Sequence, residues 1–281
     1  MCTIGALVII DPSDQLCVYG FKNADNPPVG YWHGVAGSED GYSSLAFGLL
    51  PQTGINSGMN EKGLLLISSF FGYSVPGEKE KKEGFWRGDL RGKVQAEVLA
   101  RCATAEEALA LMQERFDAAE EISIGGSHVI VDRRGGLYVF EHSQGYTAWQ
   151  DATAQGWAAR SNQSFGLFRA EQELQSADVS RDRQLRLERA ESVLSGLGGK
   201  KLDASEAIAN IEYLLRMHEN EDGSALGSVC AHGVRSGRSN APLPHDTVSG
   251  MIWDLAEAEM RYTLGQPCCN EWKRLRLGGE G

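Results

Sequence analysis

Cys2 is the residue of this 281-residue chain whose position most directly suggests chemistry. The chain begins Met-Cys-Thr-Ile-Gly, and methionine aminopeptidases remove Met before a residue as small as cysteine. Excision would leave Cys2 with a thiol and a free α-amine, whose pKa of about 7.7–8 suits a general base near neutral pH. Nucleophile and base would then belong to one residue, although position alone favours an ordinary small residue near a start codon.

Two further segments carry polar side chains near the predicted ends of strands. Lys22 ends the second predicted strand and Asp25 follows it, and a hairpin would return both residues to the amino terminus. A cation there would stabilise a thiolate, and a carboxylate would bind an amine. Asn162 ends a later short strand, where an amide side chain can donate to a developing oxyanion. Each segment alone is also consistent with a polar turn.

The elements expected to position these residues alternate between strands and helices. Hydrophobic patterning predicts strands at residues 3–11, 16–22, 63–71, 128–132, 136–141, 146–150, 156–161, 247–255 and 261–264. It predicts helices at 93–102, 105–116, 181–194 and 204–218, with Ser180 capping the third and a Thr104–Glu107 capping box opening the second. No repeat or linker interrupts the chain, so a single domain over residues 1–281 is expected, with central sheets and outer helices.

Composition and charge exclude several functional classes. A formal net charge of -11 argues against nucleic acid or an anionic membrane as the main partner. The apolar run Ile4–Ile10 lacks a basic flank and is far shorter than the roughly 20 residues that span a bilayer, so a cytoplasmic protein is expected. The six cysteines follow no zinc pattern, and no nucleotide or flavin fingerprint occurs. No metal and no cofactor are therefore expected.

Taken together, the motifs resemble a known group of enzymes. The chain resembles N-terminal nucleophile hydrolases of the cysteine branch in five places. These are residues 2–3 (Cys-Thr), 20–25 (Gly-Phe-Lys-Asn-Ala-Asp), 59–64 (Met-Asn-Glu-Lys-Gly-Leu), Asn162 and a stretch from Thr247 to Cys268. That branch includes choloylglycine hydrolases, penicillin V acylases and acyl-coenzyme A:6-aminopenicillanic acid acyltransferase-like proteins, and the C-terminal stretch resembles the last group most. The resemblance implies an α+β fold, the αββα four-layer sandwich.

The resemblance also implies residue roles. Cys2 would be the nucleophile and its α-amine the base, with Lys22 beside the thiolate. Asp25 would bind the N-terminal amine, and Asn162 would donate to the oxyanion with a backbone N–H near Phe70.

Substrate-binding residues are expected in the loops at 26–42 and 72–86 and in the C-terminal half. Phe70, Trp86, His232 and Arg235 are the candidates. Many relatives carry an arginine in the segment that here contains Ala231, so either His232 or Arg235 would replace it or its function would be absent. Aromatic loops favour an apolar or aromatic acyl group.

The expected reaction is hydrolysis of a linear N-acyl amide through a thioester on the nucleophile. The expected partner is a small-molecule N-acyl amide, without nucleic acid or membrane, and a homo-oligomer is left open. Alternatives are an acyltransferase that passes the acyl group to an amine, a dipeptidase-like or secernin-like enzyme, and a non-catalytic binding protein of the same fold. Class II glutamine amidotransferases also begin with Met-Cys, but this chain lacks their Met-Cys-Gly-Ile start.

Overall fold

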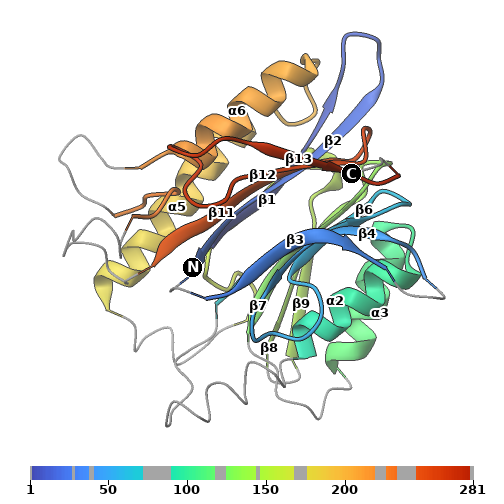
Figure 1. The fold of residues 1–281 in the computed structure, drawn as a ribbon, viewed down its shortest axis with the longest axis horizontal. Helices are drawn as coiled ribbons and strands as arrows, with labels where there is room; N and C mark the ends of the chain where they lie inside the picture. Colours follow the sequence, from blue (N-terminus) through green and yellow to red (C-terminus); the bar gives the residue numbers. More distant parts are fainter. Residues whose placement is uncertain are drawn as a thin grey trace.

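Two antiparallel sheets lie face to face between outer helices (Figure 1). The computed structural model describes residues 2–26, 29–37, 41–71, 90–117, 125–143, 146–167, 176–218, 226–232 and 245–278. Within these ranges one sheet has six strands and the other seven. None of the described helices is long and apolar enough to cross a bilayer.

The six-stranded sheet contains the chain's first hairpin. Its strands run in the order β10 (Trp157–Arg160), β1 (Cys2–Ile10), β2 (Leu16–Asn26), β11 (Asp246–Asp254), β12 (Glu259–Tyr262) and β13 (Lys273–Arg276). The Asp11 carboxylate closes the β1–β2 turn by accepting hydrogen bonds from the backbone N–H groups of Ser13 and Gln15. The predicted hairpin is confirmed, and its register pairs Cys2 with Ala24.

The seven-stranded sheet is built mainly from the middle of the chain. Its order is β3 (Tyr31–Ala36), β4 (Ser44–Leu49), β5 (Ser57–Asn60), β6 (Leu64–Phe70), β7 (Gly126–Asp132), β8 (Leu137–Ser143) and β9 (Tyr146–Asp151). Strands β3, β4 and β5 were not predicted, because they are short and interrupted by glycines. The β5–β6 turn needs Gly63, whose φ of 78° disfavours other residues. Part of the region expected to be a pocket loop is therefore strand β3.

Helices cover the outer face of each sheet. α2 (Leu90–Arg101) and α3 (Ala105–Asp117) pack on the seven-stranded sheet, whereas α5 (Ala177–Ser195) and α6 (Ala204–Arg216) pack on the other. The capping box of α3 is confirmed, because Thr104 Oγ1 accepts from the Glu107 N–H and the Glu107 carboxylate accepts from the Thr104 N–H. Helix α5 begins four residues before the expected start, and Ser176 rather than Ser180 caps it.

Three apolar layers separate the four layers of secondary structure. The central layer lies between the sheets and includes Phe47, Ile67, Val129 and Trp253, all fully buried. The outer two layers lie between each sheet and its helices. Each fully buried large apolar side chain contributes about 1.5–3 kcal/mol, so this burial holds the layers together. The arrangement is the expected αββα sandwich.

Candidate active site

Cys2 starts strand β1 and is held on both sides of its backbone. Its N–H donates to Asn162 Oδ1 at 2.7 Å, and its carbonyl accepts from Arg186 Nη1 at 2.8 Å. The residue is only 6% exposed, and its side chain belongs to the layer between the sheets. Residues from α5 and the end of β10 therefore fix the first peptide of β1 before any ligand is considered.

Lys22 extends the same inter-sheet face of the hairpin. Strand β2 continues through Asn26 rather than ending at Lys22, so Lys22 and Ala24 lie on one face with Cys2. The buried ammonium donates to Asn56 Oδ1 (2.6 Å), Ser57 Oγ (3.3 Å) and the Ser68 carbonyl (2.5 Å). Burial lowers its pKa to about 8, and nearby Cys2 and Asp25 oppose that shift.

Asp25 lies on the opposite face of β2, toward the helices. It pairs with Thr247 of β11, whose hydroxyl donates to Asp25 Oδ1 at 2.6 Å. Desolvation of this buried carboxyl raises its pKa to about 6, although the charge of Arg186 and the Thr247 hydroxyl favour its ionised form. A carboxylate in these surroundings is suited to a cationic partner.

Asn162 closely follows the last residue of β10, as the sequence predicted, and is fully buried. Its Oδ1 accepts from the Cys2 N–H and from Arg186 Nη2 (3.1 Å), while its Nδ2 donates to the Phe70 carbonyl. Ser69 Oγ donates to the Ser161 carbonyl (2.7 Å), which joins the same strand ends. The amide N–H₂ thus points at the end of β6.

Arg186 is the central residue that sequence reasoning missed. It lies on α5, is 1% exposed, and forms an ion pair with Asp182 in addition to its bonds to Cys2 and Asn162. A charged pair four residues apart is typical of an exposed helix face. The available signal was that Arg186 falls on the same helical stripe as Val179, Ala190 and Leu194, all of which are buried.

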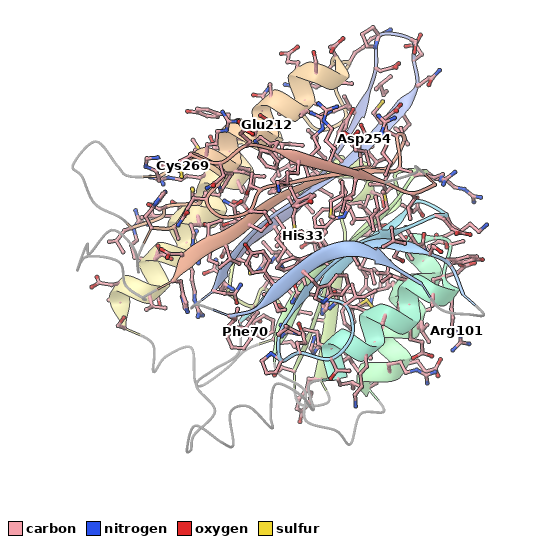
Figure 2. All side chains as sticks on the ribbon, in the orientation of Figure 1. His33, Phe70, Arg101, Glu212, Asp254 and Cys269 are labelled. Atoms are coloured by element: carbon pink, nitrogen blue, oxygen red, sulfur yellow. The ribbon has the colours of Figure 1, made fainter. Side chains whose placement is uncertain are left out.

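The other predicted site residues are not all brought to Cys2. Phe70 is close, through its carbonyl, and Figure 2 labels it at the end of the sheets from which β1 starts. His232 lies instead beside two cysteines, with its Nε2 3.1 Å from Cys268 Sγ and 3.6 Å from Cys230 Sγ. Trp86 and Arg235 lie outside the described residues, as does the expected loop at 72–86.

The arrangement combines a thiol, a buried cation, a carboxylate and an amide around one strand end. Such a set can hold an anionic sulfur, orient an amine and donate to an oxyanion, which are the requirements of acyl transfer. The site offers one thiol and one carboxylate on opposite faces of the hairpin, a poor match to a metal's ligand shell.

Comparison with known proteins decides the family. The family profile of acyl-coenzyme A:6-aminopenicillanic acid acyl-transferase matches residues 13–223, well over half of the chain. This chain belongs to that family. A comparison with curated proteins gave no significant match.

Solved structures agree with this family at the level of the fold. Penicillin V acylase from Agrobacterium tumefaciens is 13% identical, with a TM-score of 0.58 over 97% of this chain and 86% of its own. A variant of conjugated bile acid hydrolase from Clostridium perfringens is 12% identical, with a TM-score of 0.54 over 99% and 93%. The N-acylethanolamine-hydrolyzing acid amidase orthologue of Caenorhabditis elegans is 11% identical, with a TM-score of 0.50 over 90% and 92%. The fold is that of the N-terminal nucleophile hydrolases.

Proposed function

We propose that this protein is an amidohydrolase that cleaves the linear amide bond of a small N-acyl substrate, with Cys2 as N-terminal nucleophile. Membership of the family and the fold of its neighbours support an acylase, amidohydrolase or acyltransferase of this superfamily. One observation supports Cys2 as the nucleophile of an amide hydrolysis. Its backbone N–H donates to Asn162, and its thiol interacts electrostatically with Lys22, although these residues lie 160 and 20 positions farther along the chain.

Attack on the substrate begins with the thiol of Cys2. Once Met1 is removed, the α-amine of Cys2 accepts the thiol proton, and the sulfur forms a bond to the amide carbonyl carbon. Lys22 stabilises the thiolate by its charge, while Asp25 holds the resulting ammonium. Asn162 Nδ2 turns from the Phe70 carbonyl to the oxyanion of the tetrahedral intermediate.

Collapse of this intermediate breaks the carbon–nitrogen bond. The ammonium of Cys2 returns its proton to the departing amine, which leaves a neutral α-amine and a thioester on Cys2 Sγ. Water then attacks the thioester with the α-amine as base, and the carboxylic acid departs as the thiol is restored. Arg186 keeps the Cys2 carbonyl fixed throughout, so that amine and thiol retain their mutual orientation.

An acyltransferase is the second candidate, and the matching family favours it. The two reactions share every step up to the thioester. They differ only in whether water or an acceptor amine attacks it, and the second attack forms a new amide.

The test is a panel of N-acyl amides, comprising penicillin V, bile-salt conjugates and N-acyl amino acids, assayed for amine release. We expect Cys2→Ala to lower turnover at least about 10⁴-fold, since removal of a nucleophile usually has a larger effect than that. Cys17→Ala is the matched control, because Cys17 is a buried cysteine of the same sheet that faces the helices. Adding an acceptor amine and measuring new amide against free acid separates the two candidates.

The mature amino terminus provides an independent test of the mechanism. Intact-mass measurement of the active protein is expected to show loss of Met1. Active protein that retains Met1 would exclude the α-amine as base, and equal turnover by wild type and Cys2→Ala would exclude the nucleophile.

A further inference from the structure

Four side chains of types that can ligate metals, two imidazoles and two thiols, gather at the outer side of the six-stranded sheet. His218 follows helix α6, Cys230 and His232 belong to the segment at 226–232, and Cys268 lies between β12 and β13. Their spacing along the sequence fits no short metal motif, which is why sequence reasoning predicted no metal. Only the fold makes them neighbours.

Three of these residues bring their donor atoms together, and the Cys230 thiol lies beside the His232 imidazole. His232 Nε2 lies 3.1 Å from Cys268 Sγ and 3.6 Å from Cys230 Sγ. Donor atoms of His218, His232 and Cys268 all lie within 4.8 Å of one another. In a tetrahedral zinc site, Zn–S and Zn–N bonds of about 2.3 and 2.05 Å separate sulfur from nitrogen by about 3.6 Å.

The backbone holds these side chains in place. The Cys230 N–H donates to the Met217 carbonyl at 2.8 Å, which ties the segment to the end of α6. Ala231 exchanges two hydrogen bonds with Thr247, one through its N–H to Thr247 Oγ1 and one through its carbonyl. Cys230 is fully buried, and His232 forms an isolated bridge with Asp246. This backbone pairing ties His232 to the start of β11.

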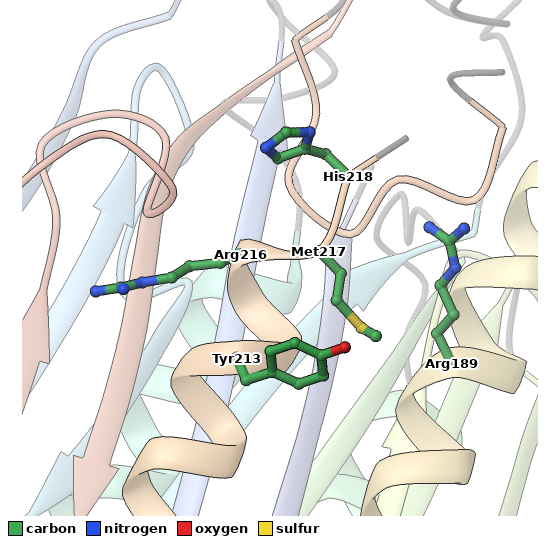
Figure 3. A pocket seen from close by; sticks show the side chains of 5 residues that line it. All are labelled: Arg189, Tyr213, Arg216, Met217 and His218. Carbon is green, nitrogen blue, oxygen red and sulfur yellow. The ribbon is translucent and has the colours of Figure 1, made fainter. Parts of the chain in front are cut away.

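A surface cavity borders the cluster at His218. His218 lines a cavity of about 290 Å³ together with Arg189, Tyr213, Arg216 and Met217. Figure 3 shows the His218 ring beyond the end of α6, apart from the Tyr213 ring and the Met217 sulfur. His218 is the most exposed of the four side chains, so the cluster meets solvent at this residue.

We propose that His218, Cys230, His232 and Cys268 bind one Zn²⁺ in a closed, structural Cys₂His₂ site. Two thiolates and two imidazoles are the donor set and number that zinc prefers in such sites. Binding forms two Zn–S and two Zn–N bonds and releases two thiol protons to solvent, without oxidation or reduction. The ion joins the end of α6 to the C-terminal loop, and Ala231 and Thr247 connect it to Asp25.

The test uses the full chain, stripped with a chelator and then dialysed against Zn²⁺ alone. We expect one zinc per chain, with affinity reduced at least about 10- to 100-fold in Cys268→Ser and in His232→Ala. Cys269→Ser is the matched control, because Cys269, labelled in Figure 2, is the exposed neighbouring thiol. Its Sγ contacts the Gln266 carbonyl. Co²⁺ substitution should add thiolate-to-cobalt charge-transfer absorption to wild type and to Cys269→Ser.

Melting temperatures and the Cys2→Ala variant are the controls for folding and for the proposed activity. Zn²⁺ should raise the melting temperature of wild type, Cys269→Ser and Cys2→Ala, but not that of Cys268→Ser. Retained binding in Cys2→Ala makes this result independent of the proposed amidase activity. Less than one zinc per chain in wild type, unchanged binding in Cys268→Ser, loss of binding in Cys2→Ala, or a Cys230–Cys268 disulfide in the isolated protein would overturn the proposal.

Discussion

The two faces of the β1–β2 hairpin carry different polar residues at the same strand end. The face between the sheets carries Cys2 and Lys22, and the face toward α5 carries Thr3 and Asp25. Alternation along the strands separates them, although Cys2 and Asp25 are only one strand position out of register. In the proposed mechanism, the first face stabilises the sulfur of Cys2 and the second binds its α-amine.

The buried cations of the two faces, Lys22 and Arg186, have different kinds of partner. Between the sheets, the Lys22 ammonium is held by neutral oxygens of Asn56, Ser57 and Ser68. On the helix face, the Arg186 guanidinium is balanced by Asp182 and lies near Asp25. A cation with neutral partners keeps its charge available to a thiolate, whereas the paired guanidinium mainly positions the backbone. Substitutions on each face therefore distinguish stabilisation of the thiolate from positioning of the backbone.

The largest effect is expected from Asp25→Asn on the helix face. Loss of the carboxylate that orients the base should lower kcat by about 10⁴-fold, as loss of the orienting aspartate does in a serine protease triad. Thr247→Val is the control, because it removes only the hydroxyl that donates to Asp25. A charged hydrogen bond contributes about 1.5–3 kcal/mol, so turnover should fall about 10- to 150-fold in that variant. Equal losses in both would contradict the role of the charge.

Asn162→Ala tests the point at which the two faces meet. Loss of one oxyanion donor should lower kcat by about 10²–10³-fold with little change in KM. The side chain also accepts from Arg186 and donates to Phe70, so its loss should lower the free energy of unfolding by about 1–3 kcal/mol. Kinetics and urea denaturation measure the two effects separately, and wild-type turnover would exclude the role.

Arg186→Lys tests positioning by the helix face alone. Lysine keeps the charge but cannot contact the Cys2 carbonyl, Asn162 and Asp182 together, so kcat should fall about 10- to 100-fold. KM should stay near its wild-type value, because Arg186 contacts the nucleophile's backbone rather than a ligand. Arg189→Lys, three residues along the same helix, is the control and should leave kcat unchanged. A rise in KM without loss of kcat would contradict positioning.

The sequence predicted the site best where short motifs coincided with strand ends. The hairpin, the capping box and the place of Asn162 after β10 all follow from local patterns. Arg186 and the cluster around His232 could not be predicted in this way, since their partners lie on other elements far along the chain. That Lys22 and Asp25 face opposite sides of the sheet could not be predicted, because strand β2 runs through Asn26. The polar residues at its end were interpreted as a turn.

The smallest effect is expected in the pH profile of kcat/KM. Activity should rise as Asp25 ionises near pH 6 and fall as Lys22 loses its proton near pH 8. The guanidinium in Lys22→Arg stays charged up to about pH 12, so that variant should lose the alkaline limb attributable to Lys22 and keep the acid one. An alkaline limb unchanged in this variant would assign it to another group.

The same two groups give opposite slopes in stability. The raised pKa of Asp25 means that the folded state retains a proton that the unfolded state has lost, so Asp25's contribution to stability falls between pH 3.8 and about 6. The lowered pKa of Lys22 makes its contribution rise between about pH 8 and 10.5. Between about pH 6 and 8 both groups are charged, so the full cost of burying each charge lowers the free energy of unfolding. The pH range of highest expected activity is therefore the range in which these two residues stabilise the fold least. Urea denaturation of wild type and Lys22→Arg from about pH 4 to 10 measures the free energy of unfolding, which should rise on the alkaline side in wild type alone.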